Sequence, residues 1–326
     1  MRAVLGIDTS CDETGVGVVI DGQVASNLIA SSAQLHQQFG GVVPELASRE
    51  HLRALGPLIQ AALAEAKITR YQLSALAVTR GPGLIGALLV GLAAAKAMAY
   101  ALHIPLIPVN HLEGHVRAAL WGSDLQPPFL ALIVSGGHTT LVEVKADGYH
   151  PIGQTRDDAV GEAFDKVARL LNLGYPGGPA IERAALSGDP QRYPLRVPMA
   201  GSDSLDFSYS GLKTAVLHLL RTYPDANPAD VAASFQHAAI TSLVNITQRA
   251  AAQLGYTRVL VTGGVAASCA LRAAFQQTAL DAIFPGKGMS TDNGAMIALA
   301  GYAQFDQTQG WDLGMNAVPY LELGKS

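Results

Sequence analysis

The feature that most constrains the fold is a pattern that opens each half of the chain. Residues 4–22 contain an apolar run, a turn of small polar residues and a second apolar run that ends in an Asp-Gly pair. Residues 129–148 repeat this order with a glycine-rich turn and another Asp-Gly pair. Such runs, bounded by turn-forming residues, are typical of β-hairpins. Two matched hairpins predict a duplicated architecture, with the two polar turns facing each other and cradling a phosphate-bearing ligand in a cleft.

The length and composition agree with two globular α/β lobes. A chain of 326 residues is long enough for about two domains. The pattern breaks at residues 121–128, which are rich in turn-forming residues. We therefore expect an N-terminal lobe over residues 1–124, completed by a C-terminal helix within 296–326, and a C-terminal lobe over 125–295.

Charge and cysteine content limit the class of protein. With 26 acidic and 22 basic residues, the composition gives no bulk signal for nucleic-acid binding. Two cysteines, Cys11 and Cys269, do not form a secreted disulfide scaffold and fit a reducing cytoplasm. Residues 84–102 have the length of a membrane span, but Lys96 lies near their centre, so a buried core helix is the better interpretation. We expect no membrane partner.

Two histidines suggest a metal site. His111 and His115 are four residues apart, so on a helix they lie on one face, one turn apart. Two imidazoles in this arrangement are able to bind one cation, but a site needs a third ligand from elsewhere in the chain. From the spacing alone, capping or surface histidines are the more common alternative.

Ten short motifs occur in order from the first strand nearly to the end of the chain, and together they are far more specific than any one of them. They are DTSCDET (8–14), VVPELASREH (42–51), GPGLIGALLVG (81–91), VNHLEGH (109–115), VSGGHTTL (134–141), GEAFDKVARLL (161–171), YPGGP (175–179), DFSYSGLKTA (206–215), GGVAAS (263–268) and STDNGAMIA (290–298). This series closely resembles the bacterial TsaD (Gcp/YgjD-type) family of tRNA N6-adenosine threonylcarbamoyltransferases.

The resemblance implies a fold and a metal centre. The fold is α/β, a duplicated actin/hexokinase/Hsp70-like (ASKHA) arrangement of two lobes with an interlobe cleft. One divalent metal is expected at the lobe interface, bound by His111, His115 and Asp292. The metal is iron or zinc, with Fe²⁺ favoured by the resemblance. Because Asp292 also lies in N-cap-like sequence, a pure capping role is the alternative for this residue.

The resemblance also implies a reaction and partners. The threonylcarbamoyl group of threonylcarbamoyl-AMP passes to the exocyclic amine of the adenosine next to the anticodon in ANN-decoding tRNAs, and AMP leaves. Partners are tRNA, a TsaB-like paralogue and a TsaE-like ATPase, and the location is cytoplasmic. The amphipathic helical region at residues 35–66 is a candidate docking surface for the paralogue, unless its apolar face is core.

The family's pattern assigns further residues. Backbone amides of the glycine-rich turn are expected to take the phosphate. The substrate-binding set is Val134, Ser135, Gly136, Gly137, His138, Asp165, Gly178, Glu182 and Ser268. Ser268 stands where the family usually has asparagine, which puts a hydrogen bond to the adenine in question. Asp12 and Glu13 in the first turn are candidate catalytic acids, with turn formation or helix capping as the alternative.

Three other functions remain open. An ATP-dependent kinase of the same fold would share both phosphate-binding hairpins but does not require the histidine pair. A metallopeptidase of the HExxH type needs Glu directly after the first histidine, whereas here Leu112 follows His111 and Glu113 comes one place late. A non-catalytic scaffold is a further, weaker possibility.

Overall fold

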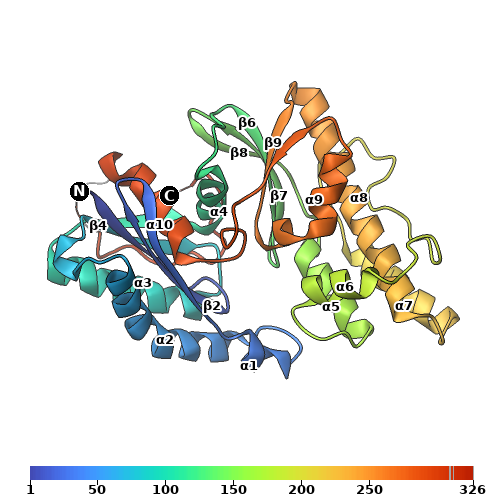
Figure 1. Ribbon diagram of the computed structural model, residues 1–326, viewed down its shortest axis with the longest axis horizontal. Helices are drawn as coiled ribbons and strands as arrows, with labels where there is room; N and C mark the ends of the chain where they lie inside the picture. Colours follow the sequence, from blue (N-terminus) through green and yellow to red (C-terminus); the bar gives the residue numbers. More distant parts are fainter. Residues whose placement is uncertain (308–309, 311, 326) are drawn as a thin grey trace. The chain divides into compact units, whose positions relative to one another are not determined.

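The computed structural model describes residues 1–307, 310 and 312–325. The chain forms two compact units, residues 1–122 with 286–326 and residues 123–285 (Figure 1). Residues 286–295, which were predicted to lie in the C-terminal lobe, belong to unit 1. Each unit contains one five-stranded sheet with helices packed on it. The α/β class predicted from the paired hairpins is confirmed.

The sheet of unit 1 has the order β3-β2-β1-β4-β5. Strands β1 and β2 form the predicted hairpin, while β1, β4 and β5 are parallel. The strands are β1 (Ala3–Asp8), β2 (Glu13–Ile20), β3 (Gln23–Ser31), β4 (Ala75–Gly81) and β5 (Leu106–Asn110). The helices are α1 (Ala33–Gln37), α2 (Pro44–Glu65), η1 (Arg70–Gln72), α3 (Ile85–Leu102), α4 (His111–Leu120), α10 (Gly294–Gln304) and η3 (Phe305–Gln307).

Apolar side chains of β1 point to both faces of this sheet, and helices cover both faces. Leu5 and Ile7 pack in one cluster with the buried sides of α2 and α3, and Val4 packs in the other with α10. Side chains of a strand point alternately to its two faces, so a strand apolar on both faces needs a layer on each. The carboxyl ends of β1, β4 and β5 share one edge, which brings together the loops that follow them.

Two helices of unit 1 have features that the sequence pattern does not show. Pro44 begins α2, and Pro57 lies inside this helix without breaking it. Helix α3 is long and apolar enough to cross a membrane by length and composition alone. It is not buried all round: Leu88 and Leu92 face the interior, while Ile85 and Leu89 are each 49% exposed.

The sheet of unit 2 has the order β10-β9-β6-β7-β8 and carries the second hairpin. The strands are β6 (Phe129–Val134), β7 (Thr139–Lys145), β8 (Gly148–Gln154), β9 (Arg258–Thr262) and β10 (Asp281–Ile283). The helices are α5 (Val160–Leu170), α6 (Gly177–Ala185), α7 (Ser210–Thr222), α8 (Pro228–Leu254), η2 (Gly264–Ala267) and α9 (Cys269–Gln276). Alternate residues of β6 and β9 pack against these helices in one hydrophobic core.

Candidate metal centre and substrate loops

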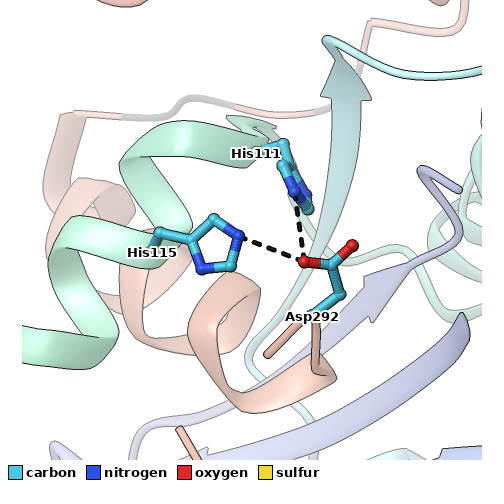
Figure 2. Close-up of side chains that lie close together, drawn as sticks. All are labelled: His111, His115 and Asp292. Atoms are coloured by element: carbon cyan, nitrogen blue, oxygen red, sulfur yellow. Dashed lines mark ion pairs between the residues drawn. The ribbon is translucent and has the colours of Figure 1, made fainter. Parts of the chain in front are cut away.

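Helix α4 presents both histidines from one buried face. It begins at His111, directly after β5 ends at Asn110, and the Asn110 side chain accepts a hydrogen bond from Leu112 N at 2.9 Å. This N-cap fixes the start of the helix. His111 is 5% exposed and His115 is fully buried. Their rings point toward the same carboxylate (Figure 2).

Asp292 is the candidate for the third ligand. Its Oδ1 lies 3.5 Å from His111 Nε2 and 3.1 Å from His115 Nε2. Three atoms bound at about 2.0–2.1 Å to one tetrahedral ion lie roughly 3.3–3.4 Å from one another. Asp292 Oδ1 therefore lies at about this spacing from both nitrogens, and the three candidate ligand atoms all lie within 4.8 Å of one another. Two imidazoles and one carboxylate are donors that suit a divalent transition metal, and they leave coordination positions open.

The chain segment that carries Asp292 belongs to the same unit as the histidines. Helix α10 packs against β1 and β2, and this packing brings the segment before it beside α4. The three candidate ligands therefore all lie in unit 1, whereas Asp292 was predicted to lie across the lobe boundary. The N-cap of α10 is Asn293, which accepts from Met296 N at 2.9 Å, so the pure capping alternative for Asp292 does not hold.

A second carboxylate orients His111. Asp8, at the end of β1, places Oδ2 3.4 Å from His111 Nδ1, and Ser10 Oγ lies 3.1 Å from the same nitrogen. Thr79 on β4 donates to the other oxygen of Asp8 at 2.7 Å. A carboxylate on the far nitrogen of a metal-binding histidine fixes its tautomer and orientation. Asp8 was not predicted as a site residue, although an acid closing an apolar strand is a recognisable signal.

The charges at this place favour a cation. Burial disfavours the charged imidazole, but Asp292 and Asp8 together hold the pKa of His111 well above its ordinary value. Burial also opposes ionisation of Asp292, yet His111 and His115 hold the pKa of this carboxyl well below its usual range. Two carboxylates concentrated in a buried site attract a positive charge more strongly than they would in water.

The first polar turn places two acids near the metal ligands. Burial raises the pKa of Glu13 to about 7, and the charges of Asp292 and Asp12 contribute in the same direction. Burial likewise raises the pKa of Asp12. Burial and the neighbouring Asp12 raise the pKa of the Cys11 thiol well above its ordinary value, so this cysteine is a poor nucleophile.

The second polar turn, at the end of β6, is closed by hydrogen bonds and exposed at its glycines. Ser135 N donates to His138 O at 2.8 Å, and His138 N donates to Ser135 Oγ at 3.1 Å. Gly136 and Gly137 are at the surface, and a Cβ added to either would meet no described atom within 4 Å. Val134, the last residue of β6, packs against Gly263 of the loop after β9.

Three of the other candidate residues of unit 2 join α5, α6 and α9. Asp165 on α5 accepts from Gly177 N at the start of α6 at 2.7 Å. Glu182 on α6 accepts from Ser268 Oγ at 2.8 Å and from Ala270 N at 3.0 Å.

Loops of unit 2 therefore converge at one place. Ser268 is the N-cap of α9 as well as the donor to Glu182. Gly161 at the start of α5 donates to Ser135 O at 3.2 Å, which joins the glycine-rich turn to α5. Gly178 lies in the first turn of α6, where a Cβ would meet no described atom within 4 Å.

Glu113 does not serve the histidine site as a general base. Its Oε2 accepts a hydrogen bond from Gln304 Nε2 at 2.9 Å, and its Oε1 lies 3.6 Å from Arg117 Nε. These partners hold the carboxylate beside Gln304 of α10 and Arg117 of α4. The geometry thus agrees with the motif spacing, which does not match an HExxH metallopeptidase.

Solved structures with low sequence identity share the fold. A HypF structure from T. kodakarensis superposes with a TM-score of 0.65 at 14% identity, covering 94% of this chain and 48% of that one. Component A of the (R)-2-hydroxyglutaryl-CoA dehydratase from Acidaminococcus fermentans gives a TM-score of 0.58 at 13% identity, covering 93% and 99% of the two chains. These neighbours are ASKHA-like, which confirms the predicted fold class.

Sequence comparisons give a closer relationship. The family model for tRNA N6-adenosine threonylcarbamoyltransferase (TsaD) matches residues 23–299. An enzyme of that name from Thermus thermophilus is 56% identical over 305 residues, 93% of this chain and 92% of the relative. The one from Clostridium kluyveri is 47% identical over 336 aligned positions, 99% of this chain and 98% of the relative. The chain therefore belongs to the tRNA N6-adenosine threonylcarbamoyltransferase family.

Proposed function

We propose that this chain transfers the threonylcarbamoyl group from threonylcarbamoyl-AMP to N6 of the adenosine next to the anticodon in ANN-decoding tRNAs. Family membership over most of the chain supports the reaction class. The observation that carries the chemistry is the convergence of His111, His115 and Asp292, whose ligand atoms all lie within 4.8 Å of one another. Because tRNA is the acceptor, the reaction belongs to the cytoplasm.

The role proposed for unit 1 is to bind and activate the group that is transferred. His111, His115 and Asp292 hold one divalent metal, iron or zinc, with Fe²⁺ favoured by the resemblance to the family; two histidines and a carboxylate are compatible with this ion. When bound, the metal supplies a Lewis acid that orients the threonylcarbamoyl group or polarises its carbonyl. Asp8 and Ser10 keep His111 in the orientation that directs Nε2 to the ion.

Asp12 and Glu13 of the first polar turn are proposed to accept the proton that the amine loses and to orient the reacting group. The adenosine amine attacks the carbonyl carbon, a C–N bond forms, and the C–O bond to the phosphate breaks as AMP leaves. The amine must lose one proton in this step. Glu13, whose pKa is raised to about 7, is suited to accept it near neutral pH, and Asp12 orients the reacting group.

The role proposed for unit 2 is to bind the adenylate. Exposed backbone amides of the turn at Gly136 and Gly137 take the phosphate, with Val134, Ser135 and His138 shaping the turn. The carboxylates of Asp165 and Glu182 accept from ribose hydroxyls, Gly178 leaves room for the nucleoside, and Ser268 stands near the adenine. The hydroxyl of Ser268 is already used by Glu182 at 2.8 Å, so it holds this acid in place and does not replace an asparagine amide.

The proposed partners are tRNA, a TsaB-like paralogue and a TsaE-like ATPase. Helices α2 and α3 expose large apolar side chains that a partner is able to cover, with Leu52 69% exposed and Ile85 and Leu89 each 49% exposed. This exposure supports a docking surface for the paralogue on the α2–α3 pair, in place of the buried side of α2.

One reconstitution tests the proposal. The protein, its two partners, ATP, bicarbonate, labelled threonine and tRNA are combined, and incorporation of label into tRNA is measured together with bound metal. His111→Ala is expected to lose both the metal and the label, while His150→Ala, which removes an exposed histidine paired with Asp147, is expected to keep both. Full activity of His111→Ala would remove the metal from the mechanism. Transfer of phosphate in place of the threonylcarbamoyl group would favour the kinase.

A further inference from the structure

The C-terminal segment returns to the start of the helix that carries both histidines. The Asn110 side chain uses its oxygen to cap α4, accepting from Leu112 N at 2.9 Å. The nitrogen of the same amide donates to Glu322 O at 3.0 Å and Leu321 O at 3.4 Å. One buried side chain therefore joins the metal-ligand helix to a segment more than 200 residues later in the sequence.

The same segment is held at the end of β4. Val318 N donates to Arg80 O at 2.9 Å, Gly83 N donates to Pro319 O at 3.1 Å, and Arg80 Nε donates to Asn316 O at 3.1 Å. An ideal Cβ placed on Gly81 would overlap the carbonyl oxygen of Val318. Residues 316–322, called the C-terminal strap below, thus pack tightly along the edge where β4 and β5 end.

The strap reaches His111 by two routes. The direct route is Asn110, the residue before His111. The second begins at Gly83, which the strap binds; its neighbour Leu84 donates to Ser10 O at 2.8 Å, and Ser10 Oγ lies 3.1 Å from His111 Nδ1. Both the backbone and the far ring nitrogen of this ligand therefore depend on contacts that the strap supports.

We infer that the C-terminal strap and Asn110 are a positioning element of the metal centre, which sets the place of His111 before metal binds. This inference rests on the proposed metal site. A ligand at the first residue of a helix has few intrahelical contacts to hold it, because the first turn lacks preceding carbonyl partners. Ligand sets held before binding lose less freedom on taking up the ion, and the residues that orient ligands change metal affinity by about 10–100-fold.

The decisive variant separates the two uses of Asn110. Asn110→Ser keeps a side-chain oxygen that caps α4 but removes the amide that reaches the strap. Asn227→Ser is the matched control, because Asn227 caps α8 in the same way, accepting from Ala229 N at 3.0 Å, in a helix without metal ligands. The affinity of full-length metal-free protein for Zn²⁺ is measured by competition with a chromophoric chelator, and Co²⁺ absorption reports the ligand geometry.

Asn110→Ser is expected to weaken Zn²⁺ binding by about tenfold and to change the Co²⁺ spectrum, while Asn227→Ser changes neither. Removal of residues after Tyr320 takes away both acceptor carbonyls and is expected to weaken binding to a similar degree. Both changes break the same link, between the Asn110 amide and the strap carbonyls. The double variant should therefore also lose about tenfold in Zn²⁺ affinity, and not a hundredfold.

Two results would overturn the inference. One is Zn²⁺ affinity and a Co²⁺ spectrum for Asn110→Ser equal to those of the unchanged protein. The other is a double variant whose loss is the product of the two single losses, which would mean that Asn110 acts independently of the strap. Asn110→Ser decides the question alone if the shortened chain does not fold. His111→Ala separates this outcome from failure of the metal site itself. If Zn²⁺ still binds to His111→Ala with unchanged affinity, the proposed metal site is wrong.

Discussion

His51 on α2 and Thr14 on β2 are joined by a hydrogen bond of 2.8 Å between Nδ1 and Oγ1. The other ring nitrogen, Nε2, lies 3.0 Å from the carbonyl oxygen of Cys11. A carbonyl only accepts, so Nε2 carries the proton and Nδ1 accepts from the Thr14 hydroxyl. Burial lowers the pKa of His51, which favours this neutral form. One imidazole thus holds both ends of the turn that carries Asp12 and Glu13.

The first prediction concerns this link. His51→Leu removes both hydrogen bonds and is expected to lower kcat by about a hundredfold, because small displacements of reacting groups have effects of this size. His51→Gln retains a donor for the Cys11 carbonyl and should recover part of the rate. Bound metal, measured by mass spectrometry, should be unchanged in both variants. Loss of metal in His51→Leu would show that the variant disrupts the whole site and does not only displace the first polar turn.

The second prediction concerns pH and Glu13. Its pKa rises from 4.5 in the unfolded chain to about 7 in the folded, metal-free protein because of burial and the charges of Asp292 and Asp12. Through Glu13, the folded state then binds more protons than the unfolded state between these values, so the contribution of this group to stability is largest at low pH and falls as pH rises through this window. Glu13→Gln should remove this slope and gain up to about 3 kcal/mol at pH 8.

Denaturant unfolding of metal-free protein at several pH values between 4.5 and 8 provides the measurement. The variant is compared with the unchanged protein at each value. Equal slopes for the two proteins would contradict the assignment of the shift to Glu13. In the transfer assay, where metal is bound, the same group should give a rise in rate with pH that Glu13→Gln lacks, centred below pH 7 because a nearby cation favours the charged carboxylate.

The third prediction tests how α10 places Asp292. An ideal Cβ on Gly294 would overlap backbone atoms of Val16 and Gly17 in β2, so Gly294→Ala must push the helix away from the sheet. Such overpacking costs about 1–3 kcal/mol, and more where backbone is the obstacle. We expect a lower melting temperature and weaker metal binding. Gly211→Ala in α7 has no described atom within 4 Å of the added Cβ and should be neutral or slightly stabilising.

The fourth prediction addresses the adenylate site of unit 2. Ser268→Ala removes the cap of α9 and the hydroxyl that donates to Glu182. The cap loss is expected to cost about 1 kcal/mol of stability. If Glu182 binds the ribose, its release should raise KM for threonylcarbamoyl-AMP severalfold with little change in kcat. Thr222→Ala, an exposed helical hydroxyl on α7, serves as the control, and an unchanged KM in Ser268→Ala would argue against the ribose role.

The fifth prediction tests the α2–α3 docking surface. Leu52→Asp places a charge on an exposed apolar side chain and should weaken binding of the TsaB-like partner by about thirtyfold, the ~2 kcal/mol typical of an important interface residue. Leu186 on unit 2 is 85% exposed, so Leu186→Asp is the matched control and should bind normally. Calorimetric titration measures both, and equal affinities would place the partner elsewhere.

Local sequence was sufficient for the parts of the fold that depend on neighbours in the chain. The two hairpins, the helical register of His111 and His115 and the family relationship were all readable, because turn chemistry and side-chain period are encoded within a few residues. The surroundings of a helix were harder to predict. Residues 84–102 were expected to form a buried core helix, yet Leu89 on α3 is half exposed, because composition does not say how many neighbours a helix has.

Whether the third ligand reaches the histidines was decided by tertiary structure. Resemblance pointed to Asp292, but this residue lies 177 positions after His115, and the stretch between them carries no periodicity that brings the two together. Close packing of α10 on β1 and β2 does so, and the same edge of the sheet adds Asp8 and Asn110 from strands far apart in sequence. The sequence by itself determined the histidine pair and the family; the packing of distant segments decided how its ligands are completed and oriented, because such contacts depend on the shape of the whole unit.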